Sequence, residues 1–349
     1  MPGQMFYFHR AQSFEFTVIA ESGERFVDFA PYVAAVDERG VVTFQAGLRA
    51  GGSGVFCGDG GPLVSIIDPT GGDIREVCSH PDRSSDAATC FYGDHSAGFR
   101  GVFLVRDGQL HTIARGDIGP LGPTMNERGD VAYRATRADG VAGIHVGRVG
   151  ATMTIAETGD RFHHFEGLPV IAESGMVAFR AALRAGGHGI YLHAGVQATD
   201  GLETVVETGA EFRDLGLFPI VTGACVVAFS GTLRDGRSGV FVVADGQRAC
   251  LADTDDGFAS IRGVNMSNGG ATVFYATPPD ADIGIYAGRH PVNDRIFGIG
   301  DRFRGAVVTD FVLNPVSMND AGQLAIRAQL SDGRQFILRA DPTTAPRLA

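Results

Sequence analysis

The side chains best suited to chemistry lie in one short run, Phe162-His163-His164-Phe165-Glu166, which holds the one adjacent histidine pair of the sequence. Side chains alternate along an extended strand, so His164 and Glu166 are expected on one face and His163 on the other. An imidazole beside a carboxylate can act as a general base or bind a metal ion. We therefore assign His163, His164 and Glu166 as candidate catalytic residues. Solvated loop residues, or a hydrogen bond between repeats, are the alternative interpretation.

A second run, Cys78-Ser79-His80-Pro81-Asp82, spaces a thiol, an imidazole and a carboxylate two residues apart. On an uninterrupted strand these three side chains would point the same way and form a metal or nucleophile cluster. His80 is therefore a fourth candidate catalytic residue. Pro81 disfavours regular strand geometry, so a locally distorted strand is the alternative.

Five further polar residues are candidates for substrate binding. Asp94 and His95 lie in an irregular turn that is expected near the channel of the fold described below, and an exposed polar turn is the alternative. Arg262, Asn265 and Asp310 are expected at the channel ends, where they can bind a carboxylate, a phosphate or a sugar hydroxyl. Structural caps explain these three residues equally well.

Several common catalytic motifs are absent from the sequence. All 29 basic residues are Arg, which excludes Schiff-base lysines and P-loops. His188 and His193 are five residues apart around a turn and a strand, so they do not form the helical zinc motif H-E-x-x-H. No G-x-S-x-G motif occurs. No motif requires a cofactor; metal ligands stay unassigned, and a divalent metal ion stays open.

A repeated motif specifies the elements that must position these residues. Its clearest copies are the segments 126–133 and 319–326, each a polar corner followed by an apolar strand. The seven copies begin at residues 37, 84, 126, 172, 222, 267 and 319, so their starts are 47, 42, 46, 50, 45 and 52 residues apart. A period in this range is typical of a repeat architecture in which neighbouring units bury a shared core.

One repeat contains four expected strands. In the fourth repeat they are predicted at residues 167–173, 176–183, 189–193 and 202–206, with a Gly-rich turn between the second and third. In the second of these strands Val177, Phe179, Ala181 and Leu183 alternate onto one face. Four antiparallel strands in fewer than about fifty residues make one blade of a β-propeller.

The last repeat lacks its fourth strand, and the N-terminus supplies a matching one. Only two strands, 324–330 and 336–339, follow the last motif, whereas residues 16–23 repeat the pattern of 154–159 without a preceding blade. We therefore predict an all-β, seven-bladed propeller closed by an N-terminal strand at residues 14–20, which removes the exposed sheet edges. Residues 1–349 are expected to form one domain, with blades beginning near residues 27, 74, 117, 162, 212, 258 and 305.

The tandem motif resembles the Asn-x-x-Gly-x-x-Ala-Phe repeats of a largely uncharacterised bacterial family whose members are commonly exported and anchored. The resemblance covers about residues 14–340 and implies a propeller. It supplies no catalytic residues. Only some copies here keep the Asn or the final Phe, and the first residues lack the basic and apolar regions of an export signal.

Composition restricts the partners and the compartment. The net charge of −11 and the pI near 5.3 disfavour nucleic-acid binding, which needs clustered cations. No apolar run is long enough to span a membrane, so the cytoplasm is the expected compartment. The five Cys are an odd number without a C-x-x-C pair and are expected to be buried, reduced thiols.

Two functions fit these features. The first is a small-molecule enzyme of the lyase, hydrolase or cyclase class that acts on a polar substrate at the channel mouth by histidine–carboxylate acid–base chemistry. The alternative is a non-catalytic propeller that binds a glycan or a protein, with a purely structural role as a third option. The enzyme interpretation predicts that His164, Glu166 and either His80 or His95 converge on one pocket. The expected partner is a small polar molecule or glycan, and the oligomeric state stays open.

Overall fold

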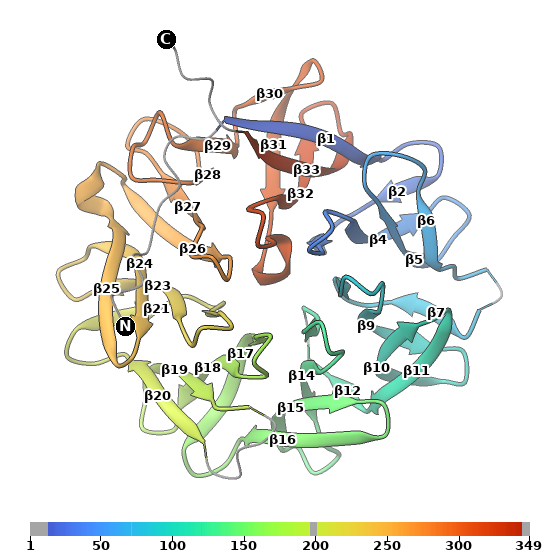
Figure 1. The fold of residues 1–349 in the computed structure, drawn as a ribbon, viewed down its shortest axis with the longest axis horizontal. Coiled ribbons are helices and arrows are strands. Elements are labelled where there is room, and N and C mark those ends of the chain that lie inside the picture. Colours follow the sequence, from blue (N-terminus) through green and yellow to red (C-terminus); the bar gives the residue numbers. More distant parts are fainter. Residues whose placement is uncertain (1–12, 71, 120, 196–200, 344–349) are drawn as a thin grey trace.

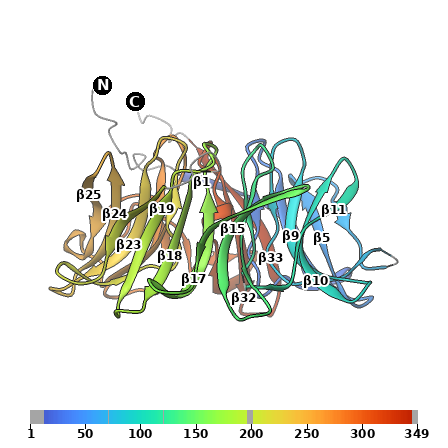
Figure 2. The same ribbon diagram turned by 90° about the horizontal axis from the view of Figure 1, so that it is seen from below.

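Seven antiparallel sheets stand around a common axis (Figure 1). The computed structural model describes residues 13–70, 72–119, 121–195 and 201–343. Seen from the side, the sheets form a single layer (Figure 2). The predicted all-β, seven-bladed propeller is confirmed. In the described ranges the helical elements are two short 3-10 turns, and none is long and apolar enough to cross a membrane.

Each blade runs from an innermost strand outward, and we number the blades in chain order. The strands of blades one to four are β2 (Phe26–Asp28), β3 (Ala35–Val36), β4 (Val42–Leu48), β5 (Ser53–Gly58) and β6 (Val64–Ile67); β7 (Ile74–Val77), β8 (Asp82–Arg83), β9 (Thr89–His95), β10 (Phe99–Arg106) and β11 (Gln109–Arg115); β12 (Asp117–Ile118), β13 (Thr124–Met125), β14 (Val131–Thr136), β15 (Ala142–Arg148) and β16 (Ala151–Glu157); and β17 (Phe162–Ile171), β18 (Val177–Leu183), β19 (His188–His193) and β20 (Leu202–Glu207).

Blades five to seven follow the same plan. Their elements are β21 (Phe212–Leu215), β22 (Ile220–Val221), β23 (Val227–Leu233), β24 (Ser238–Ala244) and β25 (Gln247–Asp253); η1 (Thr254–Asp256), β26 (Ser260–Met266), β27 (Thr272–Thr277), β28 (Gly284–Tyr286) and β29 (Arg295–Gly298); and β30 (Arg302–Phe303), β31 (Ala306–Val312), η2 (Pro315–Ser317), β32 (Leu324–Leu330), β33 (Gln335–Thr343) and β1 (Ser13–Glu21).

Alternating apolar residues build the core between neighbouring blades. In β18 the predicted face of Val177, Phe179 and Ala181 is fully buried, and Phe179 pairs with Tyr191 of β19. This face packs against Ile144 of blade three. Each blade therefore covers its apolar face with the next blade, which is why one repeat cannot fold alone.

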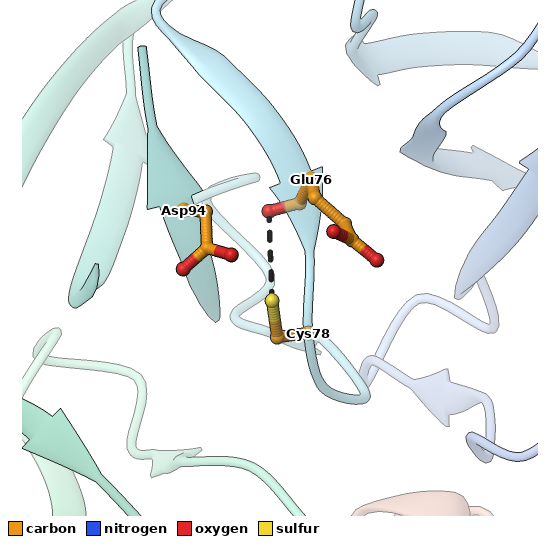
Figure 3. A group of neighbouring side chains, drawn as sticks. All are labelled: Glu76, Cys78 and Asp94. Atoms are coloured by element: carbon orange, nitrogen blue, oxygen red, sulfur yellow. Dashed lines mark hydrogen bonds between the residues drawn. The ribbon is translucent and has the colours of Figure 1, made fainter. Parts of the chain in front are cut away.

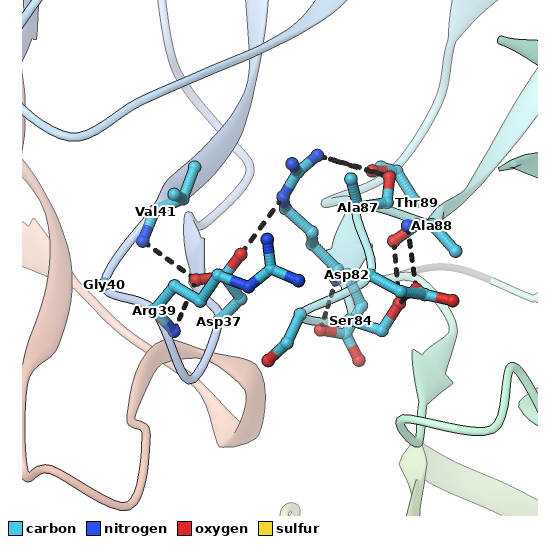
Figure 4. Close-up of polar contacts among 12 residues, drawn as sticks. Asp37, Arg39, Gly40, Val41, Asp82, Ser84, Ala87, Ala88 and Thr89 are labelled. Carbon is cyan, nitrogen blue, oxygen red and sulfur yellow. Dashed lines mark hydrogen bonds and ion pairs between the residues drawn. The ribbon is translucent and has the colours of Figure 1, made fainter. Parts of the chain in front are cut away.

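The first residue of the motif closes the turn between the first and second long strands. In blade one, Oδ1 of Asp37 accepts the N–H groups of Arg39 and Val41, both at 2.9 Å (Figure 4). Asn and Asp favour such turns because their short side chains bond the backbone two residues on. Arg83 of blade two reaches back to Oδ2 of Asp37 at 3.2 Å. The motif therefore shapes its own turn and, here, contacts the next blade.

The second motif residue joins one blade to the next around the ring. Its side chain accepts the backbone N–H of the second motif residue in the preceding blade at five of the seven junctions. The donor–acceptor pairs are Ser85–Glu127 (2.8 Å), Glu127–Glu173 (3.0 Å), Gly223–Asn268 (2.7 Å), Asn268–Asp320 (2.6 Å) and Asp320–Glu38 (3.0 Å). At the two other junctions the acceptor position is occupied by Gly223, which has no side chain, and by Ser85, whose side chain is short. We call this ring the carboxylate rim.

The N-terminal strand closes the ring, as predicted. β1 pairs with β33 along its whole length, from Ser13 opposite Thr343 to Glu21 opposite Phe336. Ile19 is only 5% exposed and belongs to the core between blades one and seven. Blade seven also has a short strand, β30, which pairs with the start of β31 and which the repeat did not predict.

The expectation that every Cys is buried is wrong. Cys57 and Cys90 are buried, but Cys78 is half-buried and Cys225 and Cys250 are exposed, all as free thiols. Cys225 stands where the motif usually has Gly and has a φ of 63°, so it adopts the left-handed conformation of that turn. The turn position, rather than a need for burial, determines where this thiol lies.

The carboxylate rim predicts that stability falls as the pH rises from about 5 to 8. Burial, with repulsion from Asp320, Glu127 and Glu173, raises the pKa of Glu38 to about 7. A raised folded-state pKa means that the folded protein holds this proton more tightly than the unfolded chain, so stability is lost as the carboxyl ionises. E38Q keeps an oxygen for the N–H of Asp320, and its melting temperature should therefore fall less steeply with pH than that of the wild type.

The matched control is E203Q, which removes an exposed carboxylate on the outer strand of blade four and should leave the wild-type slope. Melting temperatures of the three proteins, measured from pH 5 to 8, test whether Glu38 carries the pH dependence. Parallel curves for wild type and E38Q would show that the rim does not carry the pH dependence.

Candidate functional site

Glu166 is the centre of a group of charged and titratable side chains in blade four. It lies on β17, the innermost strand, and its Oε2 is 2.9 Å from Nδ1 of His188. Its Oε1 is 3.3 Å from Nε2 of His164. The guanidinium of Arg180 donates to the same carboxylate. We call Glu166, His164, His188 and Arg180 the blade-four cluster.

The sheet register brings the blade-four cluster together. His164 and Glu166 are two residues apart on β17 and contact each other, as the alternation predicted. Arg180 on β18 is the direct cross-strand partner of Glu166, and opposite charges at paired positions stabilise a sheet. His188 is the first residue of β19. No local sequence pattern marks Arg180 or His188, because their relation to Glu166 depends on strand pairing.

The electrostatics keep Glu166 ionised. Burial raises the pKa of the Glu166 carboxyl, but the attraction of Arg180 and His188 outweighs burial and lowers that pKa below its usual value. The Arg180 side chain is 5% exposed, whereas the His164 side chain is 51% exposed. His164 is therefore the most exposed member of the cluster, ahead of His188 at 35%. The Glu166 carboxylate lies on the Nε2 side of the ring, so Nδ1 is the nitrogen that is left for a ligand.

His163, the other candidate on β17, has different surroundings. It is exposed, and its ring meets that of His164 edge to face with centroids 5.2 Å apart. Within the described residues it makes no ion pair with Glu166. His163 is therefore a neighbour of the blade-four cluster and not a member.

Blade two does not form the predicted Cys78, His80 and Asp82 cluster. β7 ends at Val77 and β8 begins at Asp82, so the chain between them is not extended as one strand. The three side chains consequently have separate partners. The alternation rule fails here because the innermost strand is broken, as it also is in blades one, three and five. This outcome matches the distorted-strand alternative.

His80 lies buried where three blades meet. Its Nε2 is 3.1 Å from the carbonyl oxygen of Pro123 in blade three, and its Nδ1 is 3.4 Å from Nδ2 of Asn314 in blade seven. Burial lowers the pKa of His80 to about 4, so the ring is neutral at pH 7. A Cβ at position 122 would come within 2.6 Å of the ring, so Gly122 is required there. Both nitrogens are engaged, and neither is offered to His164 or Glu166.

Cys78 instead faces Glu76 and Asp94 (Figure 3). The ligand atoms of these three residues lie within 4.8 Å of one another, the one such group in the described ranges. A thiolate and carboxylates can bind a divalent metal ion. However, burial and the nearby Asp94 raise the pKa of Cys78 to about 11, and Arg100 binds both oxygens of Asp94, at 2.8 and 3.1 Å. The thiol proton and Arg100 would compete with an ion here.

His95, a candidate for substrate binding with Asp94, serves its own turn. Its Nδ1 accepts the N–H of Ala97 at 3.0 Å, and its ring stacks on Phe99 with centroids 4.6 Å apart. These contacts match the polar-turn alternative. Asp94 and His95 therefore do not join the blade-four cluster.

The three candidates at the channel ends have different environments. Asn265 is buried and donates to the carbonyl oxygen of Asn314 at 2.6 Å. Asp310 is paired with Arg327 at 3.1 Å. Arg262 is exposed, and no ion pair to it is formed within the described residues. Of the three, Arg262 is the side chain available to a ligand.

Comparison with known proteins relates the fold to propeller enzymes. No family model and no curated protein matches the sequence. Among solved structures, oligogalacturonate lyase in complex with manganese is similar with a TM-score of 0.57 and 10% identity, over 95% of this chain and 98% of that chain. Oligogalacturonate lyase from Vibrio parahaemolyticus has a TM-score of 0.56 and 10% identity, over 94% and 98%.

A peptidase is similar over a smaller share of its length. Prolyl oligopeptidase B from Galerina marginata gives a TM-score of 0.57 and 11% identity over 90% of this chain but 47% of that chain. The present chain thus spans about half of that peptidase. At these identities the likenesses show a shared propeller fold.

Proposed function

We propose that the protein is an enzyme that acts on a small polar substrate by acid–base chemistry at the blade-four cluster. We further propose that the reaction is an elimination from a sugar that bears a carboxylate. The observation that carries the proposal is the exposed His164 imidazole held by the ionised Glu166. The two lyase structures support the reaction class, because they are similar over nearly their whole length and the peptidase is not.

The chemistry assigns a role to each member of the cluster. Nδ1 of His164 removes the proton from the carbon next to the substrate carboxylate. The electron pair of that C–H bond forms a C=C bond with the neighbouring carbon, whose C–O bond breaks, and the leaving oxygen takes a proton from solvent. Glu166 stabilises the imidazolium that forms, while Arg180 and His188 hold Glu166 in place. A positioned base of this kind contributes about 10²- to 10⁴-fold to a rate.

Arg262 is the proposed binding residue for the substrate carboxylate. It occupies in blade six the position that Glu166 occupies in blade four, because each pairs with the residue eight places after the local motif begins. The two side chains therefore stand at the same level of the ring. A guanidinium binds a carboxylate through two hydrogen bonds and stabilises the charge that develops when the adjacent carbon loses its proton.

The proposal predicts turnover of oligomers of 4-linked uronates. The product contains a C=C bond conjugated to the carboxylate, so ultraviolet absorbance reports the reaction. The assay is run with and without added Mn²⁺, and methyl-esterified and neutral oligomers of the same length serve as controls. We expect the acidic oligomers to be consumed faster than both controls.

The non-catalytic alternative makes the opposite prediction. Saturable binding of the acidic oligomers without any unsaturated product, under both metal conditions, would replace the enzyme with a glycan-binding propeller. Release of a saturated sugar would indicate hydrolysis and overturn the elimination.

A further inference from the structure

A buried apolar side chain fills the start of the innermost strand in six of the seven blades. In blade four it is Phe162, which is 4% exposed and packs edge to face on Tyr191 of β19, with centroids 4.9 Å apart. The equivalent residues, between 0 and 4% exposed, are Phe26, Ile74, Phe212, Phe258 and Val308. We call this side chain the plug of its blade.

Blade three has no plug. The connection from β11 to β12 is the single residue Gly116, whereas four residues connect β16 to β17 in blade four. Asp117 pairs with Thr136, so counting back along the chain puts Arg115 at the plug position. Arg115 is exposed, and its guanidinium lies 3.9 Å from the centroid of the Phe99 ring instead of entering the blade. The shortened connection leaves the plug space to other occupants.

The space is an open cleft of about 800 Å³ between blades two and three. Among the residues that line it are Ala114, Tyr133, Ala135, His145, Thr152 and Thr154. A volume in this range is typical of small-molecule sites and exceeds what one side chain fills. Small residues and a Tyr ring form its walls, so a flat ring can enter where Phe162 lies in blade four.

His145 gives the cleft a polar group in a buried position. It is 9% exposed and stands where blades one, four and five have Phe56, Tyr191 and Phe241. Its Nδ1 is 3.2 Å from Oγ1 of Thr154, and its ring stacks on Tyr133 with centroids 5.3 Å apart. In the part of the chain that the structure describes, Nε2 has no hydrogen-bond partner. This nitrogen is not fully enclosed by the protein, so it can bond to a polar group of a ligand in the cleft.

Arg115 gives the cleft a guanidinium that is free of ion pairs among the described residues, and the Asp117 carboxylate also lines the cleft. Within the described ranges no carboxylate forms an ion pair with it, whereas Arg137, also at the cleft, is paired with Asp139 at 2.8 Å and Glu157 at 2.6 Å. An unpaired guanidinium beside an apolar cleft favours an anionic ligand.

We infer that this cleft binds a small aromatic carboxylate with a polar group on its ring. The ring takes the place of the missing plug, the carboxylate pairs with Arg115, and the polar group bonds to His145. The site is separate from the blade-four cluster, and the inference does not rest on the proposed function.

Titration of the full chain with 4-hydroxybenzoate tests this site. Calorimetry or ligand-observed NMR should give saturable binding to the wild type with a Kd in the range of about 0.1–1 mM, as expected for a ligand of this size. R115Q should weaken binding about tenfold, since it removes the charge pair. H145F should weaken binding at least about tenfold while keeping the wild-type melting temperature, because Phe occupies this position in other blades. Cyclohexanecarboxylate and galacturonate should bind more weakly, as neither presents a flat ring.

The matched control is R161Q, which changes the arginine whose guanidinium lies over Tyr191, 4.6 Å from the ring centroid, in the plugged blade four. It should leave the affinity for 4-hydroxybenzoate unchanged. The inference is overturned if the wild type shows no saturable binding of the aromatic acid, or if R115Q and H145F bind it as the wild type does. Tighter binding of galacturonate than of 4-hydroxybenzoate would overturn the ligand class.

Discussion

Replacing His164 with Gln should lower kcat/KM for the uronate substrate about 10²- to 10⁴-fold. Gln has a similar size and can still bond to Glu166, but it cannot take a proton from carbon. The matched control is H163Q, the same change one residue earlier, where the ring does not contact Glu166. H163Q should keep a rate near that of the wild type. Equal losses in the two variants would remove His164 from the mechanism.

Replacing Glu166 with Gln tests the partner of His164. E166Q should reduce kcat/KM to a similar extent, because an amide does not stabilise the imidazolium. It also leaves the buried Arg180 without its partner on β17, so its melting temperature must be measured beside its rate. A kcat/KM of E166Q equal to that of the wild type would contradict the role of Glu166.

Replacing Ile19 with Asp should destabilise the protein by about 3–5 kcal/mol, the usual cost of an uncompensated buried charge. Ile19 is 5% exposed and lies in the core that joins the first and last blades. β1 completes the sheet of blade seven by pairing with β33, so the damage falls on the seam. We expect a melting temperature lower by about 4–7 °C, with loss of hydrogen-exchange protection first in β1 and β33.

The control for the seam is V27D, the same kind of change at a Val that is 50% exposed on β2. This variant should unfold close to the wild-type temperature. If I19D lost protection evenly over all seven blades, the seam would not be a separate weak point. If I19D and V27D were equally stable, the pairing of β1 with β33 would not hold the ring closed.

The sequence predicts the fold well because each repeat carries its own turn signals and strand alternation. The seam follows from one unmatched copy of the fourth strand, and the contact of His164 with Glu166 follows from the period of two in β17. These features depend on local patterns, which a single sequence contains.

The remaining features depend on how distant segments meet. Arg180 reaches Glu166 through cross-strand register, and His188 does so from the next strand. His80 has the residue type and spacing of a catalytic group, but a break in the innermost strand of blade two turns it toward Asn314, 234 residues away. The carboxylate rim does have a signal in the sequence, because the second motif residue is polar in most copies. The meaning of this signal is clear only when the blades are known to be adjacent.

Departures from the repeat mark both proposed sites. Blade four differs from the repeat in having the histidine pair beside Glu166. Blade three differs in having a shortened connection between β11 and β12, and in having His145 where blades one, four and five have Phe or Tyr. In a ring of similar units, a residue found in every blade serves the fold, and a residue found in one blade is free to serve a ligand.

The most direct test of the account is a crystal structure of the H164Q variant, prepared without chelator and soaked with a uronate oligomer. This variant is used because it should bind the oligomer without converting it. We predict that the carbon next to one sugar carboxylate lies within reach of the side chain at position 164, with that carboxylate on Arg262. Density for the oligomer on another face of the propeller, with the blade-four cluster free of it, would contradict the central claim.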